Sequence, residues 1–203
     1  VDIILNVSRK NVKIFQDFFN LKAYIFDEKK LNRCDIYAPL LDVDIEFTWD
    51  QSKEMVLDAF KSFSPTAFEY ANEIFELQHI HSELVPGKRQ GAYCYTATKD
   101  VSPYVFLNYA GHMSDTFTLM HELGHAIHGR AARNQTEFTF HSSLPIAETA
   151  STFSELILSR KLIEESDERV QINLASTNID NKYGTIMRQA FFVIFEKDAH
   201  ELI

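Results

Sequence analysis

The sequence has 203 residues, of which 45% are hydrophobic and 24% are charged, with 29 acidic against 20 basic side chains. This near-average composition excludes a wholly disordered chain. The net charge of −9 argues against a partner bound through clustered Lys and Arg, such as nucleic acid. No apolar run reaches the ~20 residues of a membrane span, so we expect no membrane partner. The two cysteines cannot build a disulfide framework and suggest a reducing, cytoplasmic compartment. The sequence gives no indication of oligomeric state.

The first third of the chain predicts helices and one strand. An apolar and aromatic run from Val12 to Phe26 indicates a helix. Residues 43–49 alternate apolar with polar side chains, which is typical of a half-buried strand. Residues 55–63 return to helical spacing, and Ser64 with Pro65 begins another helix that continues to about Gln78.

The middle of the chain predicts a small sheet followed by a helix. Residues 91–98 and 104–109 are rich in aromatic and β-branched side chains, and we expect both to be strands. Ser114 and Asp115 can cap and complement a helix that runs to about Gly129.

Two further helices are predicted in the C-terminal part. Pro145 opens a long helix, and the last helix runs from about Tyr183 to the end of the chain, each with an apolar stripe. The predicted fold class is therefore mainly α with a small β-sheet. Because the chain opens at Val1 and stops in an apolar stretch, we expect it to be a piece of a longer protein.

Residues 121–125 have the sequence HELGH and match the motif HExxH. On a helix, residues i and i+4 lie on the same face, so His121 and His125 can converge on one metal ion. Glu122 lies about 100° around the helix from His121 and is placed to act on a water rather than to bind the metal. Zinc suits two imidazoles and a carboxylate, with a fourth position left for water.

The helix that begins at Pro145 offers a third ligand. One of its faces is polar, opposite the apolar stripe, and consists of Glu148, Ser151, Thr152 and Glu155. A metal-binding helix packed against this face would bring Glu148 to the ion. Glu155, two turns further, is the rival third ligand or an acceptor for a histidine N–H.

Gly124 is unexpected inside the motif, because glycine costs about 1 kcal/mol against alanine in a helix interior. It predicts that another backbone passes close to this helix, and the strand at residues 91–94 is one candidate. Cys94 in that strand could approach the metal, but the sequence favours a buried, inert thiol. His128, one turn after His125, is interpreted as solvated or as a hydrogen-bond partner rather than as a ligand.

The motif also has extended surroundings. The sequence around it is GKRQGAYCYTATKDVSPYVFLNYAGHMSDTFTLM before HELGHAIHG, LPIAETASTFSE after it, and LKAYIFDEKKLNRCDIYAPL earlier in the chain. Over most of residues 21–202 these segments resemble the zinc-binding core of oligoendopeptidase F and the related thimet oligopeptidases.

The resemblance implies a zinc metalloendopeptidase that hydrolyses short peptides. It makes His121, His125 and Glu148 the ligands of one zinc ion, and Glu122 the base that activates the zinc-bound water. The resemblance also implies that Gly91, Ala92 and Tyr93 belong to an edge strand of the sheet, which would pair with an oligopeptide substrate.

Members of the resembled family continue beyond both ends of the matched region. One of their C-terminal segments carries tyrosine and histidine and closes over the substrate. We therefore expect residues 1–203 to be a single catalytic-core fragment that is weakly active or inactive alone. The alternative function is a zinc-binding structural or regulatory domain with no turnover. The presence of Glu122 favours the enzyme, because a structural site needs no base.

Overall fold

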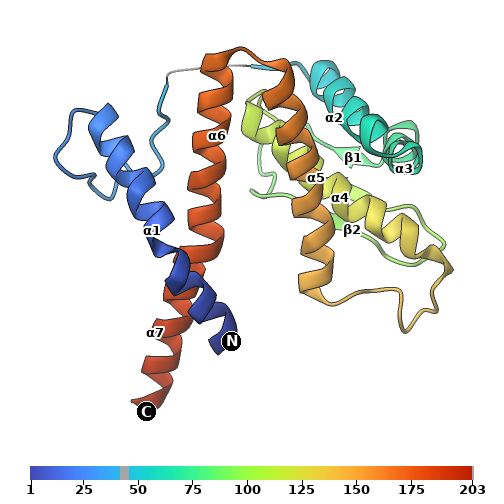
Figure 1. Ribbon diagram of the computed structural model, residues 1–203. Helices are drawn as coiled ribbons and strands as arrows, with labels where there is room; N and C mark the ends of the chain where they lie inside the picture. Colours follow the sequence, from blue (N-terminus) through green and yellow to red (C-terminus); the bar gives the residue numbers. More distant parts are fainter. Residues whose placement is uncertain (42–45, 203) are drawn as a thin grey trace. The chain divides into compact units, whose positions relative to one another are not determined.

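The structure, a computed structural model, describes residues 1–41 and 46–202 (Figure 1). The chain divides into two compact units, Val1–Val43 with Ser166–Ile203 and Asp44–Glu165. No helix in the described part of the chain has the length and apolar character that crossing a bilayer requires. The mainly α fold with a small sheet is confirmed. That one catalytic core spans the chain stays a prediction.

The unit Asp44–Glu165 combines helices with a short sheet. Its described helices are α2 (Trp49–Phe63), α3 (Pro65–Glu76), α4 (Met113–Ala131) and α5 (Leu144–Glu165), with a 3₁₀ turn at Ala132–Asn134. Its described strands are β1 (Ile80–His81), β2 (Tyr93–Tyr95) and β3 (Tyr104–Phe106). The strand order is β1-β3-β2, with β1 parallel and β2 antiparallel to β3. The strands predicted at residues 91–98 and 104–109 therefore exist but are shorter than expected, and β1 was not predicted.

The strand predicted at residues 43–49 is wrong at its C-terminal end, while residues 43–45 lie outside the described residues. The Thr48 hydroxyl accepts the backbone N–H of Gln51, and the Gln51 side chain accepts the N–H of Thr48. This reciprocal capping box starts α2 at Trp49. Only Glu46, which bridges to His112, retains a strand-like pairing.

The starts of α3 and α4 also follow local side-chain chemistry. Ser64 caps α3 through the N–H of Ala67, with Pro65 at the first position, as predicted. α4 begins one residue before Ser114, and the Asp115 carboxylate accepts the backbone N–H groups of Ala110 and His112. The capping role predicted for Asp115 is therefore confirmed, whereas Ser114 lies within the helix.

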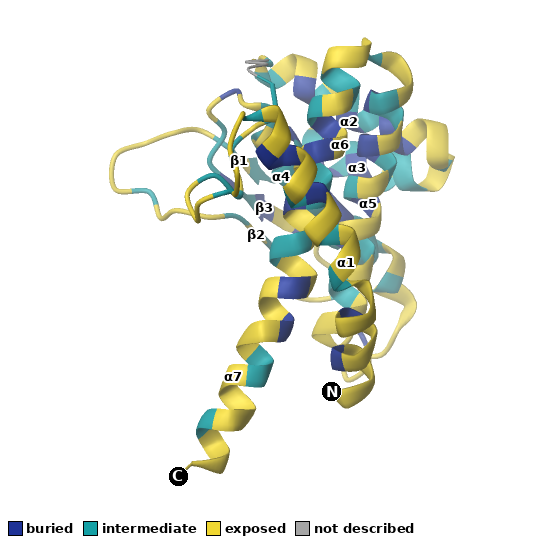
Figure 2. Ribbon diagram, turned by 60° about the vertical axis from the view of Figure 1, so that its left-hand side comes forward, coloured by how far each residue is buried: buried dark blue, intermediate teal, exposed yellow. Residues whose placement is uncertain are grey.

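The core of this unit is apolar and centres on α4, which packs against β2 and β3 of the sheet and against α2, α3 and α5. Figure 2 shows buried positions gathered on these helices. The fully buried side chains include Val56, Phe60, Ile74, Val105, Leu107, Leu119, Met120, Leu123 and Leu158.

The unit Val1–Val43 with Ser166–Ile203 is helical in its described part. It contains α1 (Asp2–Ile25), α6 (Glu168–Lys182), a π-helical turn (Tyr183–Arg188) and α7 (Gln189–Glu201). The predicted helix at 12–26 is therefore too short, and α6 was not predicted. The final helix was placed correctly, although its first turns are π-helical. Tyr183 packs its ring against Phe19, with centroids 4.8 Å apart.

Candidate active site

The predicted site lies where α4 packs on α5, at Gly124. A Cβ atom at Gly124 would lie 2.7 Å from Ser154 Oγ, 2.8 Å from Ser151 Cα and 2.9 Å from the Ala150 carbonyl oxygen. Only a glycine allows this approach. The prediction that another backbone passes close to Gly124 is confirmed, but that backbone is α5, and the expectation that it is the strand at 91–94 is wrong.

This close packing brings the two histidines of α4 to Glu148 of α5. His121 Nε2 lies 3.4 Å and His125 Nε2 3.6 Å from Glu148 Oε2, and one donor atom from each of the three residues lies within 4.8 Å of the others. These separations exceed ordinary hydrogen-bond lengths. Donor atoms about 2.0–2.2 Å from a tetrahedral ion lie roughly 3.4 Å from one another. The three residues therefore fit a zinc ion in both chemistry and spacing.

Each of these three side chains is held by a further group. His121 Nδ1 makes a short hydrogen bond with Glu155 Oε1, so its other ring nitrogen is turned toward Glu148. The ring of His125 donates to the Ala147 backbone carbonyl. Ser151 Oγ, which is buried, donates to Glu148 Oε2 at 2.9 Å. Such outer hydrogen bonds fix the orientation of metal-binding side chains.

Sequence reasoning included Ser151 in the polar face but missed its contact with Glu148, and it missed Ala147 altogether. The Ser151 contact had a signal, because Ser151 is one helical turn after Glu148. A backbone carbonyl such as that of Ala147 leaves no trace in the residue type.

Glu122 lies on the buried side of α4 and is 6% exposed. Burial raises the pKa of its carboxyl to about 7; the charge of His121 opposes this rise, and that of Glu148 adds to it. The backbone N–H of Cys94 donates to this carboxyl. Among the described residues, Glu122 Oε2 has no hydrogen-bond partner. One carboxylate oxygen is thus anchored to β2, and the other has no partner in the part of the chain that the structure describes.

The two histidines differ in their electrostatic environment. The hydrogen bond to Glu155 raises the pKa of His121, against the opposing effect of burial. Burial lowers the pKa of His125, and the neighbouring His121 lowers it further.

Strand β2 is an edge strand of the described sheet, and its outer edge faces Glu122. Val105 on β3 donates its N–H to His79, on the β1 side, so its backbone polar groups point away from β2. Cys94 is directly opposite Val105 in the antiparallel pair, so its N–H and C=O also point outward, away from β3. The hydrogen bond from Cys94 to Glu122 agrees with this direction. Among the predicted substrate-binding residues, Tyr93 lies in β2, whereas Gly91 and Ala92 precede it.

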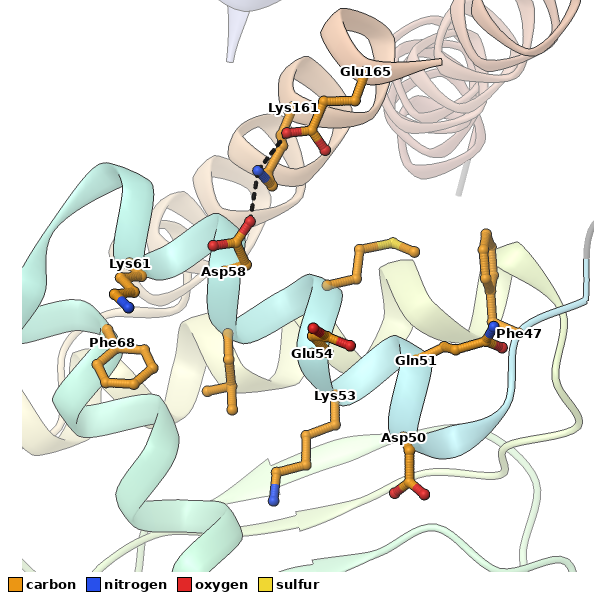
Figure 3. Close-up of a pocket in the computed structure, with 12 residues that line it drawn as sticks. Phe47, Asp50, Gln51, Lys53, Glu54, Asp58, Lys61, Phe68, Lys161 and Glu165 are labelled. Atoms are coloured by element: carbon orange, nitrogen blue, oxygen red, sulfur yellow. Dashed lines mark hydrogen bonds and ion pairs between the residues drawn. The ribbon is translucent and has the colours of Figure 1, made fainter. Parts of the chain in front are cut away.

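Two of the hollows in this unit differ in their relation to the candidate site. One, of about 260 Å³, is bordered by His125, Cys94 and the loop after α4. A larger one, of about 730 Å³, follows the outer side of α2 from Phe47 to Phe68 (Figure 3). There Lys161 pairs with Asp58 at 2.7 Å and with Glu165 at 2.6 Å. None of the predicted site residues lines the larger hollow.

The chain matches one known protein family over most of its length. The family model of peptidase family M3 matches residues 12–203. The chain belongs to peptidase family M3.

Named relatives share this region. The chain is 30% identical to the chromosomal oligoendopeptidase F of Lactococcus lactis subsp. cremoris over 99% of its own length and 34% of that protein's. It is 27% identical to the oligopeptidase PepF of Bacillus subtilis (strain 168), over 98% of its own length and 30% of that protein's. The chain thus spans about a third of the length of these relatives.

Solved structures support the fold. A crystal structure of a protein from Chlamydophila abortus superposes with a TM-score of 0.86 at 26% identity, over 98% of this chain and 34% of that one. The structure of PZ peptidase A superposes with a TM-score of 0.67 over 93% of this chain and 34% of that one, at 18% identity. The second likeness concerns the fold alone.

Proposed function

We propose that this sequence carries the catalytic site of a zinc metallopeptidase that hydrolyses short peptides. The observation that supports it most is the meeting of His121, His125 and Glu148 beside Glu122, whose buried carboxylate faces the free edge of β2. Family membership supports the reaction class. The names of the relatives, oligoendopeptidase F and oligopeptidase, support short peptides as substrates.

In this proposal His121, His125 and Glu148 hold one zinc ion and leave a coordination position open. When bound, zinc acts as a Lewis acid that lowers the pKa of a bound water and polarises the scissile carbonyl. Glu155 and the Ala147 carbonyl hold the two imidazoles in the orientation that presents Nε2 to the ion. They are positioning groups rather than ligands.

Glu122 carries both proton transfers. Its carboxylate takes a proton from the attacking water as the water oxygen bonds to the carbonyl carbon. It then returns that proton to the leaving nitrogen as the C–N bond breaks. The Cys94 N–H fixes the carboxyl at the sheet edge. The free edge of β2, with the segment at Gly91, Ala92 and Tyr93, holds the peptide in an extended form by strand addition.

Zinc content and hydrolysis test the proposal in two independent measurements. The wild-type protein and Glu122→Gln should each bind one zinc per chain by elemental analysis, and His125→Ala should lose it. Glu122→Gln should hydrolyse a quenched fluorescent peptide about 10²–10⁴-fold more slowly than wild type. Glu69→Gln, an exposed change of the same kind on α3, is the matched control and should retain both properties.

The alternative, a zinc-binding domain without turnover, predicts zinc in the wild-type protein but no hydrolysis above the zinc-free background by any variant. The proposal instead predicts a hydrolysis rate that depends on zinc and on Glu122, even where that rate is low in this fragment. Equal hydrolysis by wild type and Glu122→Gln would remove Glu122 from its assigned role. Loss of zinc in Glu155→Ala with retention in Glu148→Ala would exchange the third ligand.

A further inference from the structure

The outer face of the sheet is aromatic. In β2 and β3, Cys94 and Val105 share the face that packs toward α4, since side chains alternate along a strand. The opposite face carries Tyr93, Tyr95, Tyr104 and Phe106, which are paired as Tyr93 with Phe106 and Tyr95 with Tyr104. The three tyrosines are 53%, 60% and 48% exposed. This face is defined here as the aromatic face.

The aromatic face is pre-organised and hollowed. Tyr93 stacks on Phe106 with ring centroids 4.9 Å apart, and His79 stacks on Tyr104 at 3.9 Å. Lys88 Nζ lies over the Phe106 ring, 4.6 Å from its centroid. A hollow of about 490 Å³ lies on this face. Its described lining consists of aromatic rings and imidazoles together with Gln78, Ile80 and Val105. The charged groups of Lys88 and Glu83 lie beside it, at the Phe106 ring and at His81.

The free edge of β2 continues directly into this face. A peptide paired with that edge has one residue opposite Cys94. The pairing there uses the Cys94 carbonyl, because the Cys94 N–H is donated to Glu122. The side chain of that peptide residue points to the face turned toward α4. The residues before and after it lie opposite Tyr93 and Tyr95 and point to the aromatic face. Directly opposite side chains have Cβ atoms about 4.5–5.5 Å apart and make cross-strand contacts.

We propose that the aromatic face selects the substrate. A peptide held along β2 places two side chains, separated by one residue, beside Tyr93 and Tyr95, and aromatic or branched apolar side chains are preferred at both positions. This inference rests on the proposed function, because it takes the β2 edge as the peptide site. It assigns to the side chains of Tyr93 and Tyr95 a role in specificity that strand pairing alone does not require.

Spacing is the property that tests this inference most directly. Three peptides of equal length and a serine- and glycine-rich background carry two phenylalanines at i and i+1, at i and i+2, or at i and i+3. Their dissociation constants are measured with zinc-loaded Glu122→Gln protein by fluorescence polarisation, so turnover does not interfere. The i, i+2 peptide should bind about tenfold more tightly than the other two, whichever register it adopts.

Variants locate the effect. Changing Tyr93→Ala and Tyr95→Ala together should reduce the i, i+2 preference to less than twofold, while Tyr93→Phe with Tyr95→Phe should keep it because the rings remain. Tyr104→Ala, on the same face but one strand further from the free edge, is the matched control and should also keep the preference. Equal binding of the three peptides, or a preference that survives loss of both rings, would overturn the inference.

This experiment separates the inference from the proposed function. Selective binding to Glu122→Gln combined with no hydrolysis by zinc-loaded wild type would remove the peptidase and leave the aromatic face as a peptide-binding surface. Hydrolysis of all three peptides with equal kcat/KM and equal affinity would do the reverse. Resistance of Tyr93 and Tyr95 to nitration in the peptide-free protein would show that another part of the protein covers the face, which also contradicts the inference.

Discussion

The interiors of the two compact units differ: both bury apolar side chains, but the unit formed by Val1–Val43 and Ser166–Ile203 also buries an ion pair. In Asp44–Glu165, the helices meet through fully buried apolar side chains such as Phe60, Leu119 and Leu123. In the unit formed by Val1–Val43 and Ser166–Ile203, a fully buried side chain is Lys22, which pairs with Asp180 at 2.8 Å. Much of α7 is exposed, as Figure 2 shows. Large apolar side chains remain exposed along α1 and α7 of that unit; they include Ile3, Ile4, Ile14, Phe191, Phe192 and Phe195.

This difference matters for the candidate site. Three ligands from two helices need a fixed helix spacing, and close packing of backbone on backbone supplies it at Gly124. A buried ion pair, by contrast, depends on the charge of both partners and becomes a liability when one is removed. Changes in Asp44–Glu165 should therefore disturb the proposed zinc site. Changes in the unit formed by Val1–Val43 and Ser166–Ile203 should lower stability without affecting the proposed ligands.

The largest expected effect is a loss of unfolding free energy on substitution of Lys22. Lys22 Nζ also donates to the Ile36 carbonyl, so Lys22→Met leaves both that oxygen and the Asp180 carboxylate without their partner. Breaking a buried pair from one side typically costs about 3–5 kcal/mol of unfolding free energy. Urea denaturation followed by circular dichroism measures it. The double variant Lys22→Met with Asp180→Leu is the control and should recover most of the loss, while zinc content stays at the wild-type level in both.

The loss of unfolding free energy in Lys22→Met should depend on pH. Burial raises the pKa of Asp180, against the opposing effect of Lys22. When the pKa of an acid is higher in the folded than in the unfolded protein, its protonated form stabilises the fold. This contribution to the free energy of unfolding is complete below the unfolded pKa and is lost as the pH rises through the folded pKa. Without Lys22 the folded pKa rises further, so Lys22→Met should destabilise less at pH 4 than at pH 7. An equal loss at both pH values would contradict this assignment.

Sequence patterns could not predict this ion pair. A charged residue on an amphipathic helix is normally interpreted as solvent-facing, and Lys22 and Asp180 are 158 residues apart. Helix α6 was missed for a related reason, since its buried positions are Leu174, Ser176 and Asp180 and give no apolar period. Burial in this unit follows from tertiary partners rather than from local pattern.

The second prediction concerns Gly124. Gly124→Ala gains about 1 kcal/mol of helix propensity, but its methyl group would meet the backbone of α5 at under 3 Å. Overpacking of this kind typically costs about 1–3 kcal/mol, and it forces α4 and α5 apart. We expect weaker zinc binding, measured by competition with a chelating dye, together with a lower melting temperature.

Gly184→Ala is the matched control for this change. Its added methyl group meets only the end of the Tyr37 side chain, at 3.3 Å, which can move aside. Zinc affinity should be unchanged there. Wild-type affinity in Gly124→Ala would mean that the site tolerates a wider helix spacing than the structure indicates.

Within the unit Asp44–Glu165, more was predictable from sequence. The i, i+4 spacing placed His121 and His125 on one face, and the polar face of α5 indicated that Glu148 would meet them. The same reasoning failed to identify which backbone approaches Gly124, because a glycine signals a close neighbour without naming it. The apolar stripe expected opposite this face is partly exposed, with Ile146 at 58% and Phe153 at 46%. The amphipathic pattern predicted which residues of α5 share an apolar face, but it did not predict how far that face is buried.

A smaller effect is expected at Glu155. Its hydrogen bond to His121 Nδ1 orients the ring, and removing such a partner typically lowers metal affinity by about 10–100-fold. Glu155→Ala should therefore still bind zinc, but more weakly, whereas Glu148→Ala should lose it. Thr152→Ala, an exposed change on the same helix, serves as the control. Unchanged affinity in Glu155→Ala would show that His121 needs no orienting partner.

The smallest effect on the protein itself concerns its two thiols, which report on how closely β2 packs against α4. Burial raises the pKa of Cys94 to about 12, with a hydrogen bond involving Thr96 acting against it. At pH 8 only about one molecule in 10⁴ would then carry the reactive thiolate at this position.

Cys34 is exposed in the other unit. A thiol reagent such as dithionitrobenzoate should therefore react rapidly with one cysteine per chain, and Cys34→Ser should abolish that rapid phase. Denaturation should then release the second thiol. Rapid labelling of Cys94 in the folded protein would mean that β2 separates readily from α4, and the hydrogen bond that anchors Glu122 to the strand would separate with it.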